Sequence, residues 1–174
     1  CAAAKVTASL LASVFITFFV SAFNFIFAFA AYGKEGLDCS ILFAPLGFAE
    51  GYIPFNITCG TLLKYQILLA FSSAISVTGI TLLLSAICKS QMIAFVLSAA
   101  VHLMPGMLPI SETNALYRVI VLMPFYHSQF SSIMSVEQMP NGALYALWAI
   151  PASLLFFGIG AFLSCRAFAG HQVL

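Results

Sequence analysis

The chain has 174 residues, of which 63% are hydrophobic and only 6% are charged, and its formal net charge is +1. Soluble globular proteins carry about 25% charged residues, so too few charges are present to cover a water-exposed surface. The mean hydropathy of +1.09 indicates that the bilayer is the solvent. No run of Lys and Arg occurs, which argues against nucleic-acid binding. The composition therefore predicts an integral membrane protein.

Four long apolar stretches predict spanning helices, because about 20 apolar residues cross the hydrocarbon core of a bilayer. The second and third stretches are joined only by the polar turn Lys89, Ser90 and Gln91, so they should form an antiparallel hairpin. The predicted fold class is all-α, a polytopic transmembrane helix bundle that forms a single domain over residues 1–174. The expected spans cover residues 6–32, 62–88, 92–108 and 143–164.

Residues 33–60 and 110–142 are expected to form loops on the outer side of the membrane. Gly33 suits the left-handed turn that ends a helix, and Asn141 is a good N-cap for the last span. The second loop contains the apolar run LYRVIVLMPFY, which is too short to span and is interrupted by Pro124. We expect an interfacial or re-entrant segment there.

The charged residues predict the orientation of the bundle. Lys5, Lys89 and Arg166 lie on one side with no acid, whereas all five acids lie on the other. The two sides carry three Lys or Arg each, but those of the first side lie directly against helix ends, where the positive-inside rule acts best. We therefore expect both chain ends in the cytoplasm. Cys1 in place of an initiator Met indicates a piece of a longer protein.

Polar residues on the first span repeat every three or four positions and so share one face of the helix. Two interpretations remain open: hydroxyls that pack against another helix, which is the commoner role, or the wall of a substrate path. Phenylalanines occupy the opposite face and suit lipid. The polar face comprises Ser9, Ser13, Thr17, Ser21 and Asn24, and the candidate path residues are Ser13, Thr17, Ser21 and Asn24, together with His102 on the third span.

Small residues at helical spacing predict contacts between the other spans. They are Ser72, Ser76 and Gly79 on the second span, Ala94 and Ser98 on the third, and Gly160 and Ser164 on the fourth. Two of the five cysteines, Cys39 and Cys59, share an outer loop. A disulfide is one alternative there, and two free thiols the commoner one.

No catalytic motif occurs in the sequence, so we predict a protein that is not an enzyme. His102 lies within the third span, where it is either a functional group or a neutral side chain hydrogen-bonded to a neighbouring helix. Ser98 and His102 share one helix face, which leaves an intramembrane hydrolase as a remote alternative. His127 and His171 are too far apart in sequence to predict a metal site by spacing.

The opening span begins just after a Lys and ends in YG, the second span ends in LLLSA before a K-S turn, and the run VLMPFYH is interrupted by a Pro. These three parts of the sequence resemble the type-2 family of ABC exporter permeases, in which VLMPFYH is similar to the broken helices before the last span. The resemblance lies in Lys5, Tyr32, Gly33, Leu82, Leu83, Leu84, Ser85, Ala86, Lys89, Ser90, Pro105 and Pro124.

The resemblance implies a membrane-spanning subunit whose four helices correspond to the third to sixth of a six-helix permease in a bacterial cytoplasmic membrane. It implies an ATPase subunit that binds ATP and Mg²⁺, a second permease copy or homologue, and lipid as partners, with no cofactor on this chain. The turn of Lys89, Ser90 and Gln91 would face the ATPase. A non-transporting anchor or sensor subunit is the alternative.

Overall fold

The computed structural model describes residues 2–40, 58–107, 115–127 and 147–171. Within these ranges the chain is helical, apart from turns and one isolated β-bridge between Ser40 and Thr58. The predicted all-α class is therefore confirmed. The elements are α1 (Ala2–Asp38), α2 (Cys59–Ile87), α3 (Gln91–Leu103), the 3-10 turn η2 (Met104–Met107), α4 (Ala115–Ile120), α5 (Pro124–His127) and α8 (Ala149–His171).

Three of the described helices contain segments that are long and apolar enough to cross a bilayer. They are Ala3–Ala31, Cys59–Ile87 and Ala149–Phe168, with 29, 29 and 20 residues. At 1.5 Å per residue the first two extend for about 44 Å, which exceeds a hydrocarbon core of about 30 Å. The third expected span, residues 92–108, corresponds to a shorter apolar helix, Gln91–Met107. These helices are those of a transmembrane helical protein.

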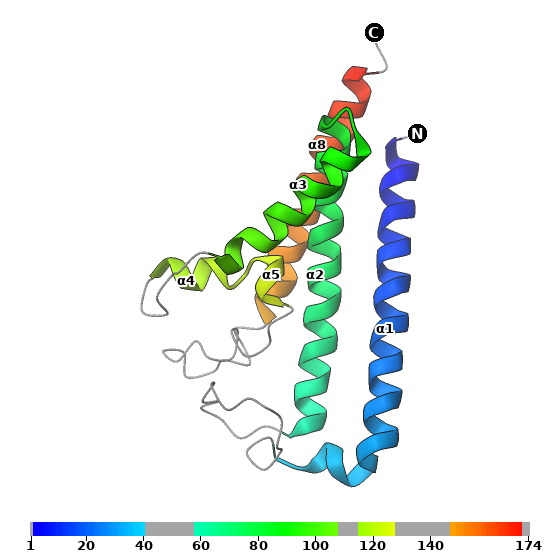
Figure 1. Ribbon diagram of the computed structural model, residues 1–174, viewed down its shortest axis with the longest axis vertical. Coiled ribbons are helices and arrows are strands. Elements are labelled where there is room, and N and C mark those ends of the chain that lie inside the picture. Colours follow the sequence, from blue (N-terminus) through cyan, green and yellow to red (C-terminus); the bar gives the residue numbers. More distant parts are fainter. Residues whose placement is uncertain (1, 41–57, 108–114, 128–146, 172–174) are drawn as a thin grey trace.

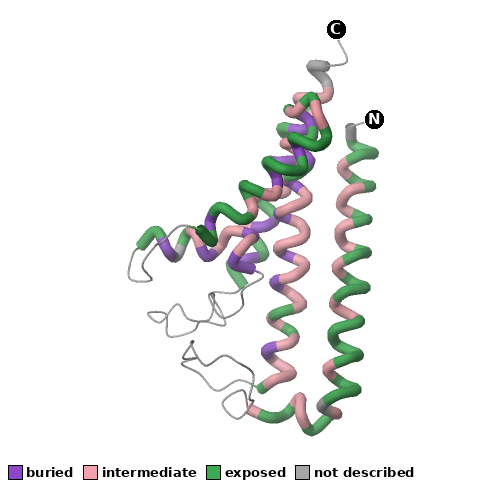
Figure 2. The backbone as a smooth tube through the Cα atoms, in the orientation of Figure 1, coloured by how far each residue is buried: buried purple, intermediate pink, exposed green. Residues whose placement is uncertain are grey.

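Helix α2 is the centre of the bundle (Figure 1). It runs antiparallel to α1 and contacts α8, α3 and α5 as well. Figure 2 shows the consequence: α2 is half-buried or buried over most of its length, whereas α1 is exposed over much of its surface. The start of α1, the turn between α2 and α3, and the end of α8 lie at one end of the bundle.

The tightest contact in the bundle is the crossing of α2 and α8. A Cβ atom added at Gly79 would lie 2.6 Å from Cα of Phe157, and one added at Gly160 would overlap the backbone of Gly79. Only glycine permits so close an approach of two helix backbones. The predicted small-residue contacts are confirmed, because their members are all buried: Ser72, Ser76, Gly79, Ala94, Ser98, Gly160 and Ser164.

Two helix ends differ from those predicted. Gly33 has a φ of 65° and interrupts α1 as expected, but a further helical turn continues to Asp38. Helix α8 continues to His171, so most of the expected C-terminal tail is helical. The sequence analysis placed the end of each span where its apolar run ends. A helix can continue beyond the bilayer without apolar residues, so its end need not coincide with the end of the run. The expected N-cap Asn141 lies outside the described residues.

The described part of the second loop packs into the bundle and does not extend as a separate domain. Ser73, at the midpoint of α2, donates a 3.1 Å hydrogen bond to the Pro124 carbonyl, and the Tyr126 hydroxyl donates one of 3.2 Å to the Pro105 carbonyl. Val121 between α4 and α5 is completely buried. The segment thus reaches the middle of a spanning helix, which supports the re-entrant alternative over the interfacial one.

Candidate functional site

Helices α1 and α2 border an open groove with a volume of about 460 Å³. This volume falls within the range of roughly 300–1,000 Å³ that is typical of small-molecule sites. Its walls are mostly apolar but carry six hydroxyl groups. The lining residues are Ser9, Ser13, Ile16 and Thr17 on α1, and Ala74, Val77, Thr78, Thr81, Leu82 and Ser85 on α2.

Two helical stripes of small and hydroxyl-bearing residues create this groove. On α1, Ser9, Ser13 and Thr17 repeat every four residues, so they lie on one face. On α2 the corresponding stripe is Ala74, Thr78, Thr81 and Ser85, at spacings of four, three and four. The sequence analysis missed this second stripe. Its signal was present in the same periodicity that revealed the first.

Among the described residues, only one hydrogen bond joins the two walls of the groove. Ser13 Oγ donates to the Ala74 carbonyl at 3.3 Å. The threonine hydroxyls instead donate to carbonyls one turn earlier in their own helices: Thr17 to Ser13 at 2.8 Å, Thr78 to Ala74 at 2.7 Å and Thr81 to Val77 at 2.8 Å. The inner part of the groove is therefore lined by hydroxyls whose protons are already engaged.

The groove runs from the middle of α1 and α2 toward one end of the bundle. Thr17 and Ala74 lie near the midpoints of the apolar segments of α1 and α2, whereas Ser9 and Ser85 lie toward the ends where α1 begins and α2 stops. From Ala74 to Ser85 the helix rises about 16 Å, close to half of a hydrocarbon core of about 30 Å. The groove therefore has the depth of a single leaflet.

The predicted path residues on α1 do not all lie in this groove. Ser13 and Thr17 line it, and Ser21 is half-buried but outside it. The expectation that Asn24 turns toward protein is wrong, because its side chain is exposed. Its Nδ2 donates a 2.8 Å hydrogen bond to the Val20 carbonyl, so its own helix satisfies the amide group without a neighbour.

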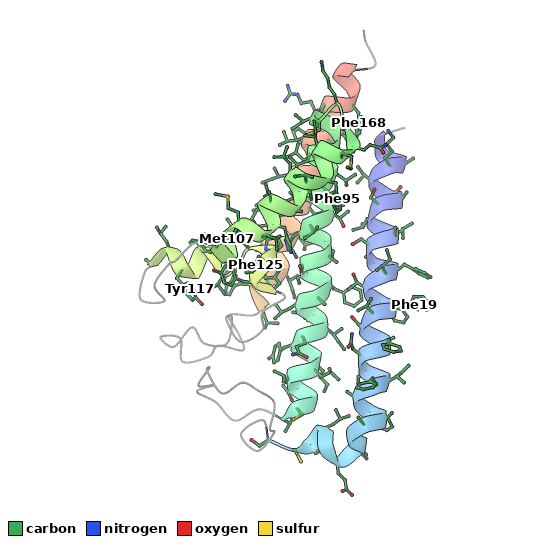
Figure 3. The ribbon with its side chains drawn as sticks, in the orientation of Figure 1. Phe19, Phe95, Met107, Tyr117, Phe125 and Phe168 are labelled. Carbon is green, nitrogen blue, oxygen red and sulfur yellow. The ribbon has the colours of Figure 1, made fainter. Side chains whose placement is uncertain are left out.

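The phenylalanines on the opposite face of α1 are exposed, as predicted. Phe15, Phe18, Phe25 and Phe29 are all exposed, Phe15 to 62%. Figure 3 shows the neighbouring Phe19 pointing away from α2. Contact of these rings with hydrocarbon tails costs no free energy, whereas their exposure to water would be unfavourable.

His102 lies outside the groove, on α3 beside the short helix α5. It is half-buried and its ring meets that of Phe125 edge-on, with 6.2 Å between the centroids; Figure 3 shows Phe125 at the junction of these elements. Its buried Nδ1 has no hydrogen-bond partner. Hydrogen bonding of this nitrogen to a neighbouring helix, one of the expected alternatives, is therefore not observed.

His127 was expected in a loop but belongs to α5, and only 3% of its surface is exposed. Neither ring nitrogen of His127 has a hydrogen-bond partner, although the Leu122 carbonyl and His102 lie close enough to the ring to interact with it electrostatically. The sequence distance between the two histidines concealed this proximity. In the described residues no three His, Cys, Asp or Glu side chains gather as a metal site.

Ser98 does not pair with His102. Its hydroxyl forms a 2.8 Å hydrogen bond with that of Thr81, which links α3 to α2. Because the Thr81 proton is engaged with the Val77 carbonyl, Ser98 is the donor in this contact. A nucleophile requires a base within hydrogen-bond reach, and this arrangement supplies none to Ser98.

The turn between α2 and α3 presents polar groups at the end of the bundle. Lys89 and Gln91 are exposed, and Ser90 is a half-buried N-cap without a side-chain capping bond. At the opposite end of the bundle, the thiols of Cys39 and Cys59 are both free, while the Cys59 amide donates to the Cys39 carbonyl at 2.9 Å.

Comparison with protein-family models, with curated proteins and with solved structures finds no match to this chain.

Proposed function

We propose that this chain is the membrane-spanning permease subunit of an ATP-driven exporter. It would pair with a second permease copy and move substrate by alternating access, driven by a separate ATPase subunit. The observation that carries the proposal is the hydroxyl-bearing groove between α1 and α2, which reaches from the middle of the spans to one end. The sequence resemblance to type-2 permeases is the second support.

The architecture is compatible with a moving wall. Helix α1 is exposed along its Phe face, and within the groove a single hydrogen bond, that of Ser13, joins it to α2, so few hydrogen bonds oppose a small displacement. By contrast, α2 and α8 interlock at Gly79 and Gly160. Alternating access requires one rigid unit that moves against another. In this proposal α1 is the mobile wall, and α2 with α8 is the rigid one.

The proposal is tested by transport in proteoliposomes that contain the full-length protein and its ATPase subunit. Thr78→Leu places a larger apolar group in the groove and should abolish most ATP-dependent transport while leaving the folded yield intact. Ala12→Leu is the matched control, because Ala12 is exposed on α1 outside the groove. If no ATPase subunit copurifies with the full-length protein, the result would instead favour a non-transporting anchor or sensor subunit.

The proposed orientation places the end with Lys5, Lys89 and Arg166 in the cytoplasm. A membrane-impermeant thiol reagent added from outside should label the exposed Cys39 and leave Cys165 unlabelled. Cysteine-free and single-cysteine variants identify the labelled position. Outside labelling of Cys165 would contradict this orientation and leave the transport assay unaffected.

A further inference from the structure

Three basic residues lie at the end of the bundle toward which the groove runs. Lys5 lies one turn before Ser9 on α1, Lys89 four residues after Ser85, and Arg166 near the end of α8 at the same end of the bundle (Figure 1). The acids among the described residues, Glu35 and Asp38, lie at the far end of α1. This end therefore carries a positive charge that no described carboxylate neutralises.

The contact of Lys5 supports this conclusion. Its Nζ lies 4.6 Å from the centroid of the Phe168 ring, a cation–π contact between α1 and α8. Figure 3 shows Phe168 beside the start of α1. An aromatic face attracts an ammonium group without cancelling its charge, so Lys5 is held near the groove and keeps its capacity to bind an anion.

The hydroxyl groups form a gradient of polarity along the groove. Near the middle of the spans, the protons of Ser13, Thr17 and Thr78 are engaged with backbone carbonyls. Toward the basic end, the hydroxyls of Ser9 and Ser85 make no hydrogen bond with any described residue. A ligand would thus meet satisfied, mostly apolar walls inside and free donors with basic groups at the mouth.

We propose that this groove binds one acyl chain of an anionic membrane phospholipid, with the headgroup phosphate at the end of the bundle that carries Lys5, Lys89 and Arg166. Three observations converge on this ligand: a length close to the thickness of one leaflet, the apolar interior, and the positive charge of this end, which no described carboxylate neutralises. A zwitterionic phospholipid supplies the same chain but less net attraction for the basic groups. The site does not depend on transport, so it goes beyond the function proposed above.

The experiment is photo-crosslinking of the full chain in nanodiscs, without ATP, by a phosphatidylglycerol that carries a diazirine on its acyl chain. Peptide mass spectrometry should locate the label at groove residues, Ile16 and Val77 among them. The same chain on phosphatidylcholine should label these positions several-fold less. Equal labelling by the two lipids, or no labelling of the groove because another helix or a second copy fills it, would overturn the proposal.

Variants separate the groove from its mouth. Ala74→Leu should remove most groove labelling, whereas Ala12→Leu, at an exposed position of α1 outside the groove, should not. Each of Lys5→Gln, Lys89→Gln and Arg166→Gln should lower the several-fold preference for phosphatidylglycerol, and the triple variant should abolish it, whereas Lys34→Gln at the far end should leave it unchanged. Thermal melting in detergent checks that every variant is folded. Undiminished labelling of a folded Ala74→Leu protein would contradict the site.

Discussion

Two of the helices that contact α2, namely α8 and α1, pack against it in opposite ways. Toward α8 its stripe of Ser72, Ser76 and Gly79 is buried, and the two backbones touch at the glycine. Toward α1 its stripe of Ala74, Thr78, Thr81 and Ser85 borders an open groove of about 460 Å³. Both stripes are short-chained and hydroxyl-rich, so polarity alone does not explain the difference.

The physical difference lies at the Cβ atom. Glycine has none, which lets helix axes approach until dispersion contacts close the interface. Threonine is branched at Cβ, and its hydroxyls on α2 bond within their own helix and not across to α1. In this bundle a stripe that contains glycine fastens two helices together, and a stripe of threonines keeps a space between them.

The largest expected effect is a collision at the α2–α8 crossing. Gly160→Ala places a methyl group against the Gly79 backbone, which can yield only if the helices separate. Overpacking of this kind costs about 1–3 kcal/mol, measured as the free energy of unfolding in detergent. Gly158→Ala is the matched control, since nothing lies within 4 Å of a Cβ atom there. Equal stability of the two variants would remove the basis of the comparison.

A smaller loss is expected where α3 is bonded to α2. Thr81→Val keeps the shape of the side chain but removes its hydrogen bond with Ser98. Such interhelix bonds contribute about 0.6 kcal/mol on average and up to about 1.7 kcal/mol. Thr78→Val, which removes only a bond within α2, should cost less than Thr81→Val in the same unfolding assay. The reverse order would show that the Ser98 contact does not stabilise the bundle.

A larger side chain on the α1 side should be tolerated. Ala74→Leu projects into open space, so we expect a change in unfolding free energy within about 0.5 kcal/mol, as for a surface substitution. The contrast with Gly160→Ala is sharp, because the larger insertion has the smaller effect. A loss as large as that of Gly160→Ala would mean that α1 and α2 are as tightly packed as α2 and α8.

The smallest expected change in the free energy of unfolding is zero or slightly stabilising. Ser76 is completely buried and its hydroxyl has no hydrogen-bond partner. An unsatisfied buried hydroxyl costs free energy, so Ser76→Ala should leave the unfolding free energy unchanged or raise it slightly. Ser72→Ala, on the same stripe, provides the comparison. Destabilisation by more than about 1 kcal/mol would indicate that the Ser76 hydroxyl is bonded in the folded protein.

Much of the fold was contained in the sequence, because bilayer insertion depends on local apolar composition. The long apolar helices, the hairpin at Lys89 and Ser90, and the exposed Phe face of α1 all follow from runs and periodicities within one segment. The small-residue contacts followed from the same reasoning. The exact ends of α1 and α8 did not, since a helix can project beyond the bilayer where its apolar run has ended.

The tertiary structure alone decided which stripes meet and how closely. The sequence marked Ser13, Thr17 and Asn24 as one face, but packing put the first two in the groove and left Asn24 outside, bonded to its own helix. It also brought His127 beside His102, although 25 positions separate them in the chain. Periodicity fixes the angle of a residue on its helix, whereas the partner of each face depends on the crossing of helices distant in sequence, which no local pattern encodes.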